Sequence, residues 1–180
     1  MNNRVVITGM GIWSCLGTSL EEVKDSLFNG KCGIVFDPVR KELGFRSALT
    51  SKVETPDLKK LIPRNQRQFM PQEAQFAYMS TLKALEQANL SQEYIDQHEV
   101  GLIFGNDSVA QATYNAVSKI YEYKDTQACG SVSIFQSMNS TVTMNLATLF
   151  RLRGINLTTS GACASGSHAI GLSYLLIQDG

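Results

Sequence analysis

Hydrophobic and polar positions along the chain alternate in blocks that predict strands followed by helices. A short apolar run, "RVVIT" at residues 4–8, precedes "GMG" and predicts a buried strand that ends in a glycine turn. Residues 18–30 follow with their apolar side chains on one helical face. Thr18 is the expected cap of this helix, with Glu21 three residues on, and Gly30 is the expected stop. The chain is therefore predicted to open with a strand and a helix.

The middle of the chain changes from irregular to strongly periodic. Residues 31–70 hold three prolines and little periodicity, which indicates a long segment over the surface. Pro71 then opens a predicted helix that ends near Asn89, because apolar residues recur at helical spacing between them. Residues 100–105, "VGLIFG", form a continuous apolar run bounded by glycine, which is typical of a strand covered on both faces.

The last third of the chain repeats this alternation. Helices are expected over about 109–123 and about 136–152, with Gly154 closing the second. "INLTT" at 155–159 predicts a third strand. "ASGSHAIGLSYLLIQ" at 164–178 predicts a helix that is apolar nearly all round and hence buried. Strands that alternate with helices predict an α/β layered fold with a largely parallel sheet.

Composition places the chain among ordinary globular proteins and excludes two classes of function. Of its 180 residues, 43% are hydrophobic and 18% are charged, and sixteen basic side chains balance sixteen acidic ones. Without net charge, the chain lacks the positive field on which non-specific nucleic-acid binding relies. No apolar stretch is long enough to cross a bilayer. A first strand explains the N-terminal residues better than a lipoprotein leader, because Trp13 and two glycines break the leader pattern.

Four cysteines and two histidines are the candidate reactive side chains. The cysteines show no CxxC spacing and the histidines complete no ligand cluster, so a zinc site is not expected. We interpret the cysteines as free thiols in a reducing cytoplasm, because no secretory leader is expected in a chain of this size. These six residues are Cys15, Cys32, Cys129, Cys163, His98 and His168.

One of these cysteines is surrounded by very small side chains. Cys163 lies in "SGACASG", residues 160–166, between the third predicted strand and the last predicted helix. Free amides and the dipole at a helix start favour an anionic sulfur, and they also stabilise the oxyanion formed when a thioester carbonyl is attacked. The pattern permits an activated nucleophile, and an inert cysteine is the alternative. His168 points off a different helical face and is expected to be a buried core histidine rather than the catalytic base.

Three segments together resemble a known family. "VVITGMGIWSCLG" at 5–17, "VGLIFGND" at 100–107 and "GINLTTSGACASGSHAIG" at 154–171 are similar, in this order and spacing, to the N-terminal half of β-ketoacyl-[acyl-carrier-protein] synthases of the type I/II elongating class. The resemblance implies a thiolase-like layered α/β/α fold, of which residues 1–180 form the N-terminal half with a mixed, mostly parallel sheet. The C-terminal half of the synthase domain is then absent from this sequence, and the first strand is expected to lack its neighbours.

The resemblance also implies an acyltransferase reaction in two stages, without metal or cofactor. An acyl group passes from acyl carrier protein to Cys163, and the enolate of a decarboxylated malonyl thioester then attacks the acyl-enzyme, in fatty acid or polyketide-type elongation. In the family, two histidines and a lysine of the C-terminal half support the second stage. Residues 1–180 alone are therefore expected to be inactive.

The segment after the second predicted strand departs from the family pattern. "GNDS", residues 105–108, stands where the family commonly has a glycine-rich segment that lines the acyl pocket near the dimer interface. Asp107 and Ser108 are therefore candidate substrate-binding residues. A carboxylate beside an alkyl chain is costly unless it is paired. Either Asp107 turns away to cap the following helix, or the substrate is not a plain saturated acyl chain.

The family resemblance implies two kinds of partner. The carrier protein is acidic, and Arg64 and Lys124 match positions of the basic patch near the pocket mouth, with Arg67 as a neighbour. Gln68 and Gln127 stand where basic residues are expected, and a solvated surface charge explains each basic residue equally well. The strand at 155–159 resembles an edge that the family pairs across a two-fold axis. A homodimer or a related heterodimer is therefore expected.

Two other classes of function compete with the condensing enzyme. A non-catalytic partner subunit would shape a pocket for a catalytic homologue, but such subunits usually lack the nucleophile, so Cys163 argues against this class. A cysteine hydrolase would need a base, for which His98 and His168 are the candidates in the sequence. Acyl chain length, saturation and pathway are left open.

Overall fold

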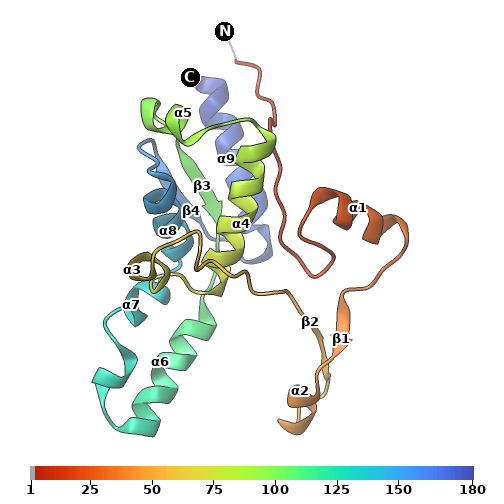
Figure 1. Cartoon of the computed structure of the whole chain (residues 1–180), viewed down its shortest axis with the longest axis vertical. Helices are drawn as coiled ribbons and strands as arrows, with labels where there is room; N and C mark the ends of the chain where they lie inside the picture. The colour runs from red at the N-terminus through yellow and green to blue at the C-terminus, as the bar shows by residue number, and fades with distance from the viewer. Residues whose placement is uncertain (1–2) are drawn as a thin grey trace.

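The computed structural model describes residues 3–180 as a helix-covered centre with two projections (Figure 1). The centre holds strands β3 (Leu102–Gly105) and β4 (Asn156–Thr159) and helices α4 (Gln72–Gln87), α8 (Thr141–Phe150) and α9 (Ser165–Asp179). One projection holds α6 (Ala110–Tyr123), the 3-10 helix η1 (Thr126–Cys129) and α7 (Ser133–Gln136). The other holds β1 (Ile34–Phe36), α2 (Pro38–Glu42) and β2 (Leu49–Ser51). The remaining short helices are α1 (Leu20–Phe28), α3 (Arg64–Arg67), α5 (Gln92–Gln97) and η2 (Ala162–Ala164).

The two central strands run parallel and are covered by different helices on their two faces. Leu102 pairs with Asn156, and the register continues to Gly105 opposite Thr159. The side chains of Leu102 and Phe104 pack against the core between α4 and α8. Gly105 faces the other way, since a Cβ at this position would collide with the start of α9. The predicted parallel strands with helices on both faces are therefore confirmed.

The hydrophobic core lies where α4 crosses α8. Val142 and Leu146 of α8 are fully buried, and the rings of Tyr78 and Phe150 stack with their centroids 5.1 Å apart. The whole buried cluster comprises Leu58, Ile62, Met70, Ala74, Ala77, Tyr78, Val142, Leu146 and Phe150. Helix α4 begins directly after Pro71, as the sequence predicts.

The predicted first strand does not form. Val6 and Ile7 are 61% and 76% exposed, and residues 4–8 pair with none of the strands in the described part of the chain. An extended segment becomes a strand only when a neighbouring strand shares its backbone hydrogen bonds, and here no such neighbour lies beside it. The expectation of a buried strand was wrong, whereas the expected lack of a neighbour agrees with the structure.

The glycines of "GMG" do not form a turn but let the segment lie directly on α4. A Cβ at Gly9 or Gly11 would collide with the carbonyl groups of Ala84 or Ser80, which face them from that helix. The backbone N–H of Met10 donates to Gln87 Oε1 at 2.7 Å and secures the same contact. Close packing of backbone against backbone, rather than a turn, therefore explains both glycines.

The cap of α1 lies one residue later than predicted. Ser19, not Thr18, occupies the cap position, and Glu22 rather than Glu21 closes the capping box. The Glu22 carboxylate accepts hydrogen bonds from the backbone N–H groups of Thr18 and Ser19, at 2.7 and 3.2 Å. The backbone bond from Thr18 is the main reason that the pKa of Glu22 lies below its ordinary value.

Two other predicted elements differ from the structure. Residues 31–70 are less irregular than expected, because β1 and β2 pair antiparallel, with Val35 opposite Thr50, the short helix α2 lies between these strands, and α3 follows them. Of the helix expected over 136–152, only α8 forms as a long helix, because residues 137–140 separate it from α7, and its 10 residues are about two turns fewer than expected. Neither the hairpin nor the break has a strong signal in the sequence.

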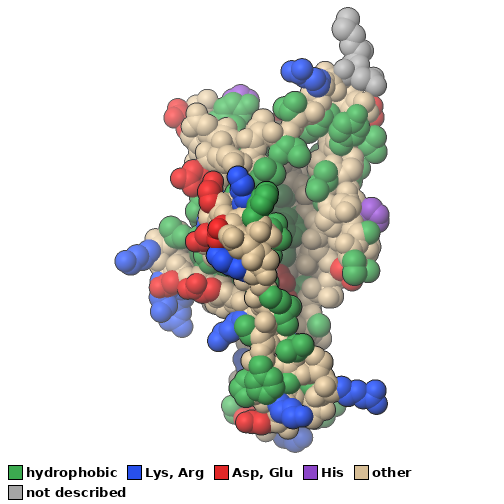
Figure 2. Space-filling model, turned by 90° about the vertical axis from the view of Figure 1, so that its right-hand side faces the viewer, with side chains coloured by type: hydrophobic (Ala, Val, Ile, Leu, Met, Phe, Trp, Pro, Cys, Tyr) green, Lys and Arg blue, Asp and Glu red, His purple; other side chains and the backbone are tan. Residues whose placement is uncertain are grey.

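Helix α9 is less buried than its apolar sequence predicts. Ser165 and Ala169 are its buried residues, while Ile170 and Leu175 are 69% and 54% exposed. Among residues 3–180, no element covers the outer face of this helix. Figure 2 shows further hydrophobic side chains at the surface, with basic side chains beside them at the lower end of the view. Exposed apolar surface of this extent is typical of a face that another element or chain covers.

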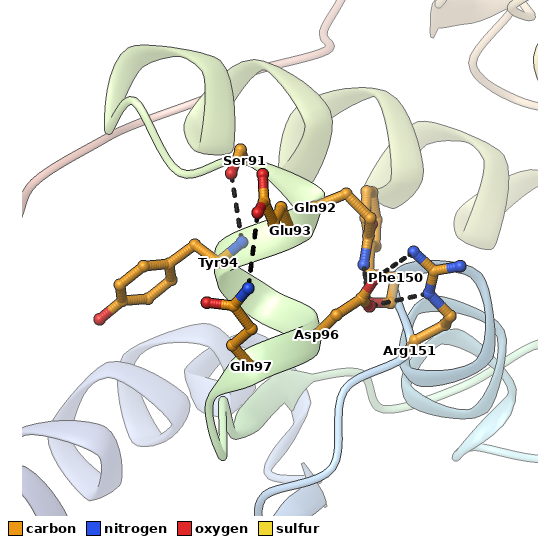
Figure 3. Close-up of polar contacts among 8 residues, drawn as sticks. All are labelled: Ser91, Gln92, Glu93, Tyr94, Asp96, Gln97, Phe150 and Arg151. Atoms are coloured by element: carbon orange, nitrogen blue, oxygen red, sulfur yellow. Dashed lines mark hydrogen bonds and ion pairs between the residues drawn. The ribbon is translucent and has the colours of Figure 1, made fainter.

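A polar cluster joins α5 to the end of α8 (Figure 3). The Arg151 guanidinium donates from Nε and Nη2 to the two oxygens of Asp96, at 2.9 and 2.6 Å. Gln92 Nε2 donates to Asp96 Oδ1 at 3.0 Å and to the Phe150 carbonyl at 2.8 Å. The bond from Gln92, followed by the contacts with Arg151, lowers the pKa of Asp96 below its ordinary value.

Replacing Asp96 with Asn is expected to lower the free energy of unfolding at neutral pH. Because the pKa of Asp96 is lowered by folding, its carboxylate stabilises the protein above the ordinary carboxyl range, and this contribution disappears as the pH falls through the folded pKa. In urea unfolding, the difference between wild type and Asp96→Asn should be present at about pH 7 and shrink toward about pH 3. Glu93→Gln on the same helix is the control, since Glu93 accepts only an exposed bond from Gln97. A difference independent of pH would contradict this expectation.

Candidate active site

Cys163 lies where the chain passes from β4 into α9. Strand β4 ends at Thr159, the short helix η2 carries the cysteine, and α9 begins at Ser165. The Cys163 side chain is exposed, and the other three cysteines are free thiols like it. The predicted position between a strand and the start of a helix is confirmed.

Side-chain hydroxyls close the turn that carries this cysteine. Ser165 Oγ accepts a hydrogen bond from the Gly161 N–H at 2.9 Å and donates to the Ala162 carbonyl at 2.7 Å. Thr159 Oγ1 donates to the Ser165 carbonyl at 2.9 Å. Ala162 adopts a left-handed conformation with φ 48°, which costs about 1–2 kcal/mol in a residue with a Cβ. These bonds therefore hold a strained backbone next to Cys163.

Asp107 reaches the same turn from the neighbouring strand. The carboxyl ends of parallel strands lie at one edge of a sheet, so the residues after Gly105 and those after Thr159 meet there. Asp107 Oδ1 accepts hydrogen bonds from Ser160 Oγ at 2.7 Å and from the Ala162 N–H at 2.9 Å. The bond from Ser160, and then the bond from Ala162, lower the pKa of Asp107 below its ordinary value.

This position of Asp107 corrects one of the two predicted alternatives. The cap residue of α6 is Val109, and no side chain donates to or accepts from the cap there within the described residues. The carboxylate is turned toward the cysteine turn instead, because the Ser160 hydroxyl and the Ala162 amide offer it two donors. Ser108, the other candidate of this segment, is exposed next to Asp107.

Gly105 brings β3 into direct contact with the first turn of α9. A Cβ at this position would collide with the backbone of Ser165 and Gly166. The glycine that ends the apolar run "VGLIFG" is therefore required by this close approach. This contact fixes the position of the turn that carries Cys163 relative to the edge of the sheet.

The two histidines are placed differently from each other. His168 is exposed on α9, so the prediction of a buried core histidine was wrong, because its side of the helix is not covered by the described residues. Its ring lies over Gly161, where a Cβ would stand 2.8 Å from Nδ1. His98 follows α5 and precedes β3, and its Nδ1 lies 2.7 Å from the Tyr94 carbonyl. His98 thus lies at the end of the sheet opposite to Cys163.

The structure brings together two of the three predicted basic residues. Arg64 and Arg67 both lie on α3 and line a pocket of about 360 Å³ that Lys59 also lines. Arg67 Nε is buried and has no hydrogen-bond partner among residues 3–180. Lys124 lies elsewhere, at the far end of α6, with its ammonium 5.5 Å from the centroid of the Tyr121 ring (Figure 1).

The hydroxyl groups of Thr159, Ser160 and Ser165 are site residues that the sequence analysis missed. In "TTSGACASG" their small size suggests only room for a substrate, because the sequence does not show which backbone groups they meet. A possible signal is the density of serine and threonine around a short turn, since such side chains commonly bond to nearby backbone groups.

Comparison with known proteins places this site in a family. A sequence model described as the beta-ketoacyl synthase N-terminal domain matches residues 2–180. The chain belongs to the β-ketoacyl synthase family. The 3-oxoacyl-[acyl-carrier-protein] synthase 1 of Buchnera aphidicola subsp. Baizongia pistaciae (strain Bp) is 35% identical over 179 residues, which cover 98% of this chain and 44% of that relative. The chain thus spans less than half the length of this curated relative.

Solved structures of β-ketoacyl synthases have the same fold. A β-ketoacyl synthase from Burkholderia phymatum STM815 matches with a TM-score of 0.84 at 29% identity, over 100% of this chain and 44% of that one. A ketosynthase solved with a type II PKS acyl-carrier protein and bound to the hexaketide matches with a TM-score of 0.75 at 19% identity, over 100% of this chain and 49% of that one. The thiolase-like fold is therefore confirmed. Within residues 3–180, no helix combines the length and the apolar character that crossing a bilayer requires.

Proposed function

We propose that this chain supplies the acylated cysteine of a β-ketoacyl-[acyl-carrier-protein] synthase. In this proposal Cys163 holds an acyl group that condenses with malonyl-[acyl-carrier protein] after loss of carbon dioxide, in fatty acid or polyketide-type elongation. The observation that carries it is the exposed Cys163 at the start of α9 in a chain of this family. A non-catalytic partner subunit is disfavoured, because such a subunit has no use for an exposed and positioned thiol.

The geometry around Cys163 supports the first half of the reaction. The thiolate attacks the carbonyl carbon of the acyl thioester, a new C–S bond forms, and the bond to the carrier's sulfur breaks as that thiol takes up a proton. No side chain caps the start of α9 within the described residues, although the Ser165 N–H already donates to the Ala162 carbonyl, so an anion would meet the amides that follow Ser165. Such amides stabilise both the thiolate and the tetrahedral oxyanion.

Acyl carrier protein is the proposed partner at α3. Arg64 is exposed on this short helix and can pair with an acidic group of the carrier, and Arg67 lies one turn away on the same helix. Lys124 at the end of α6 offers a second basic point of contact. The free cysteines agree with a location in a reducing cytoplasm, which we include in the proposal.

A dimer through β4 completes the proposal. In the described part of the chain β4 pairs only with β3, so its other edge keeps unpaired backbone groups, and Ile155 and Leu157 are exposed beside it. A second copy, or a related chain, would pair with this edge across a two-fold axis. The proposal also includes the assignment of residues 1–180 to the N-terminal half of a synthase domain.

Acylation from a carrier thioester tests the proposed function. The protein, expressed from its complete natural gene, is mixed with acyl-[acyl carrier protein], and peptide mass mapping locates the acyl group. We expect a stable acyl group on Cys163 that is released by malonyl-[acyl carrier protein] as a 3-oxoacyl product. Rapid release by water alone would indicate a hydrolase, and acylation of Cys15, Cys32 or Cys129 instead would refute the assignment of the nucleophile.

Reversing a charge on α3 is expected to weaken the carrier interaction selectively. Arg64→Glu should raise the KM for acyl-[acyl carrier protein] by about tenfold, because an attractive ion pair becomes a repulsive one, and added salt should reduce the difference. Transfer from a small acyl thioester without the carrier protein should be unchanged. Arg46→Glu, an exposed residue between α2 and β2, is the matched control. Equal loss with both acyl donors would contradict carrier binding at Arg64.

A further inference from the structure

Asp107 is the one charged side chain that bonds directly to the turn carrying Cys163 within residues 3–180. We infer that Asp107 is a positioning residue, whose carboxylate holds this turn in its reactive conformation rather than contacting the acyl chain. The inference rests on the proposed function of Cys163 and adds a determinant of its reactivity.

The two bonds of Asp107 hold the part of the turn that leads into Cys163. A single oxygen, Oδ1, accepts from the Ser160 hydroxyl and from the Ala162 amide, which lie three residues and one residue before Cys163. The parallel register sets this arrangement, because Gly105 lies opposite Thr159 and both chains continue past the same edge of the sheet. Asp107 therefore links the end of β3 to the residues that follow β4.

Asp107 and Ser165 together clamp the strained residue next to the nucleophile. Ala162 has φ 48°, a left-handed conformation that residues with a Cβ rarely adopt. Its N–H is bound by Asp107 and its carbonyl by the Ser165 hydroxyl, so both polar groups of this residue are held. Cys163 follows directly, and the direction of its side chain depends on the conformation of Ala162. Without the carboxylate, Ala162 is free to relax and turn the sulfur away from the start of α9.

The carboxylate is well suited to this role because it stays ionised. Hydrogen bonds from Ser160 and Ala162 keep the pKa of Asp107 below its ordinary value. A charged acceptor forms shorter and stronger hydrogen bonds than a neutral one. Because Oδ1 already accepts two hydrogen bonds from the protein, Asp107 offers no favourable contact to an apolar acyl chain. The same two bonds hold the turn at two points.

Two neutral variants separate the hydrogen bonds from the charge. Asp107→Asn keeps an oxygen at the position of Oδ1, and Asp107→Ala removes it, while both remove the negative charge near the sulfur. The probe is iodoacetamide, which has no acyl chain, and the rate of alkylation of Cys163 is followed by mass mapping against time. Exposed Cys32 is the internal reference. The protein is expressed from its complete natural gene, and Asp96→Asn is the distant control.

We expect Cys163 to be alkylated about fivefold more slowly in Asp107→Ala than in Asp107→Asn, the scale of one lost hydrogen bond. Ser160→Ala should show a smaller effect in the same direction, and its effect should vanish in the Asp107→Ala background. The KM for an acyl thioester should be the same in both Asp107 variants.

Equal alkylation of Cys163 in the two Asp107 variants would overturn the inference. A higher KM for the acyl thioester in Asp107→Ala, with an unchanged alkylation rate, would also overturn it and assign the residue to substrate contact. If Asp107→Ala does not fold, the alkylation rate of Cys163 in Ser160→Ala is compared with that in wild type, and a slower rate in the variant supports the inference. Failure of the proposed function gives a different result from failure of this inference. In that case Cys163 accepts no acyl group, whatever the ratio of the alkylation rates of the two Asp107 variants.

Discussion

Replacing Cys163 with Ala is expected to abolish acyl transfer from acyl-[acyl carrier protein], with a loss on the order of a thousandfold or more. Without the sulfur, the thioester between Cys163 and the acyl group cannot form, so the two-stage route through this residue is closed. The measurement is the rate of acyl transfer, together with the mass of the protein after incubation with the acyl donor.

A cysteine elsewhere on the surface serves as the control for this variant. Cys32 is also exposed, so Cys32→Ala should leave transfer at the wild-type rate. Urea unfolding of both variants should resemble wild type, because neither side chain belongs to the buried cluster. Substantial transfer by Cys163→Ala, with the acyl group on another residue, would show that the nucleophile lies elsewhere.

Replacing Gly105 with Ala is expected to lower acyl transfer by about a hundredfold although Cys163 is intact, since small displacements of reacting groups carry losses of this size. The added Cβ would collide with the backbone of Ser165 and Gly166, and a backbone cannot move aside as a flexible side chain can. The start of α9 must therefore shift together with the cysteine turn. Overpacking of this kind also lowers the free energy of unfolding by about 1–3 kcal/mol.

Gly101 provides a matched control near the opposite end of the same strand. A Cβ there would stand 3.0 Å from the Ile155 carbonyl oxygen, a milder contact that lies away from Cys163. Gly101→Ala should reduce stability in urea unfolding without a comparable loss of acyl transfer. Equal activity of the Gly105 and Gly101 variants would show that the β3–α9 contact does not position the cysteine.

Local signals in the sequence predicted the elements that depend on local chemistry. Pro71 marks the start of α4, the apolar run at 100–105 contains β3, and the segment "INLTT" at 155–159 contains β4. A proline at a helix start, or a continuous apolar run, restricts the backbone wherever the segment is placed. These predictions were therefore correct without knowledge of the tertiary contacts.

Several predictions that required knowledge of a neighbour failed. Residues 4–8 have the composition of a strand but lie unpaired, and α9 has an apolar surface that the described residues leave exposed. His168 is exposed for the same reason. Pairing and burial are properties of two surfaces, and a pattern along one segment describes only one of them.

The sequence by itself determined that Cys163 stands among small residues between a strand and a helix, and it identified the family to which the chain belongs. Only the tertiary structure decided what holds the cysteine in place. The parallel register of β3 and β4 brings Asp107 to Ser160 and Ala162, which are 53 and 55 residues away along the chain. Hydrogen bonds are directional and short, so the partner of a carboxylate depends on a few ångströms of packing that no local pattern encodes.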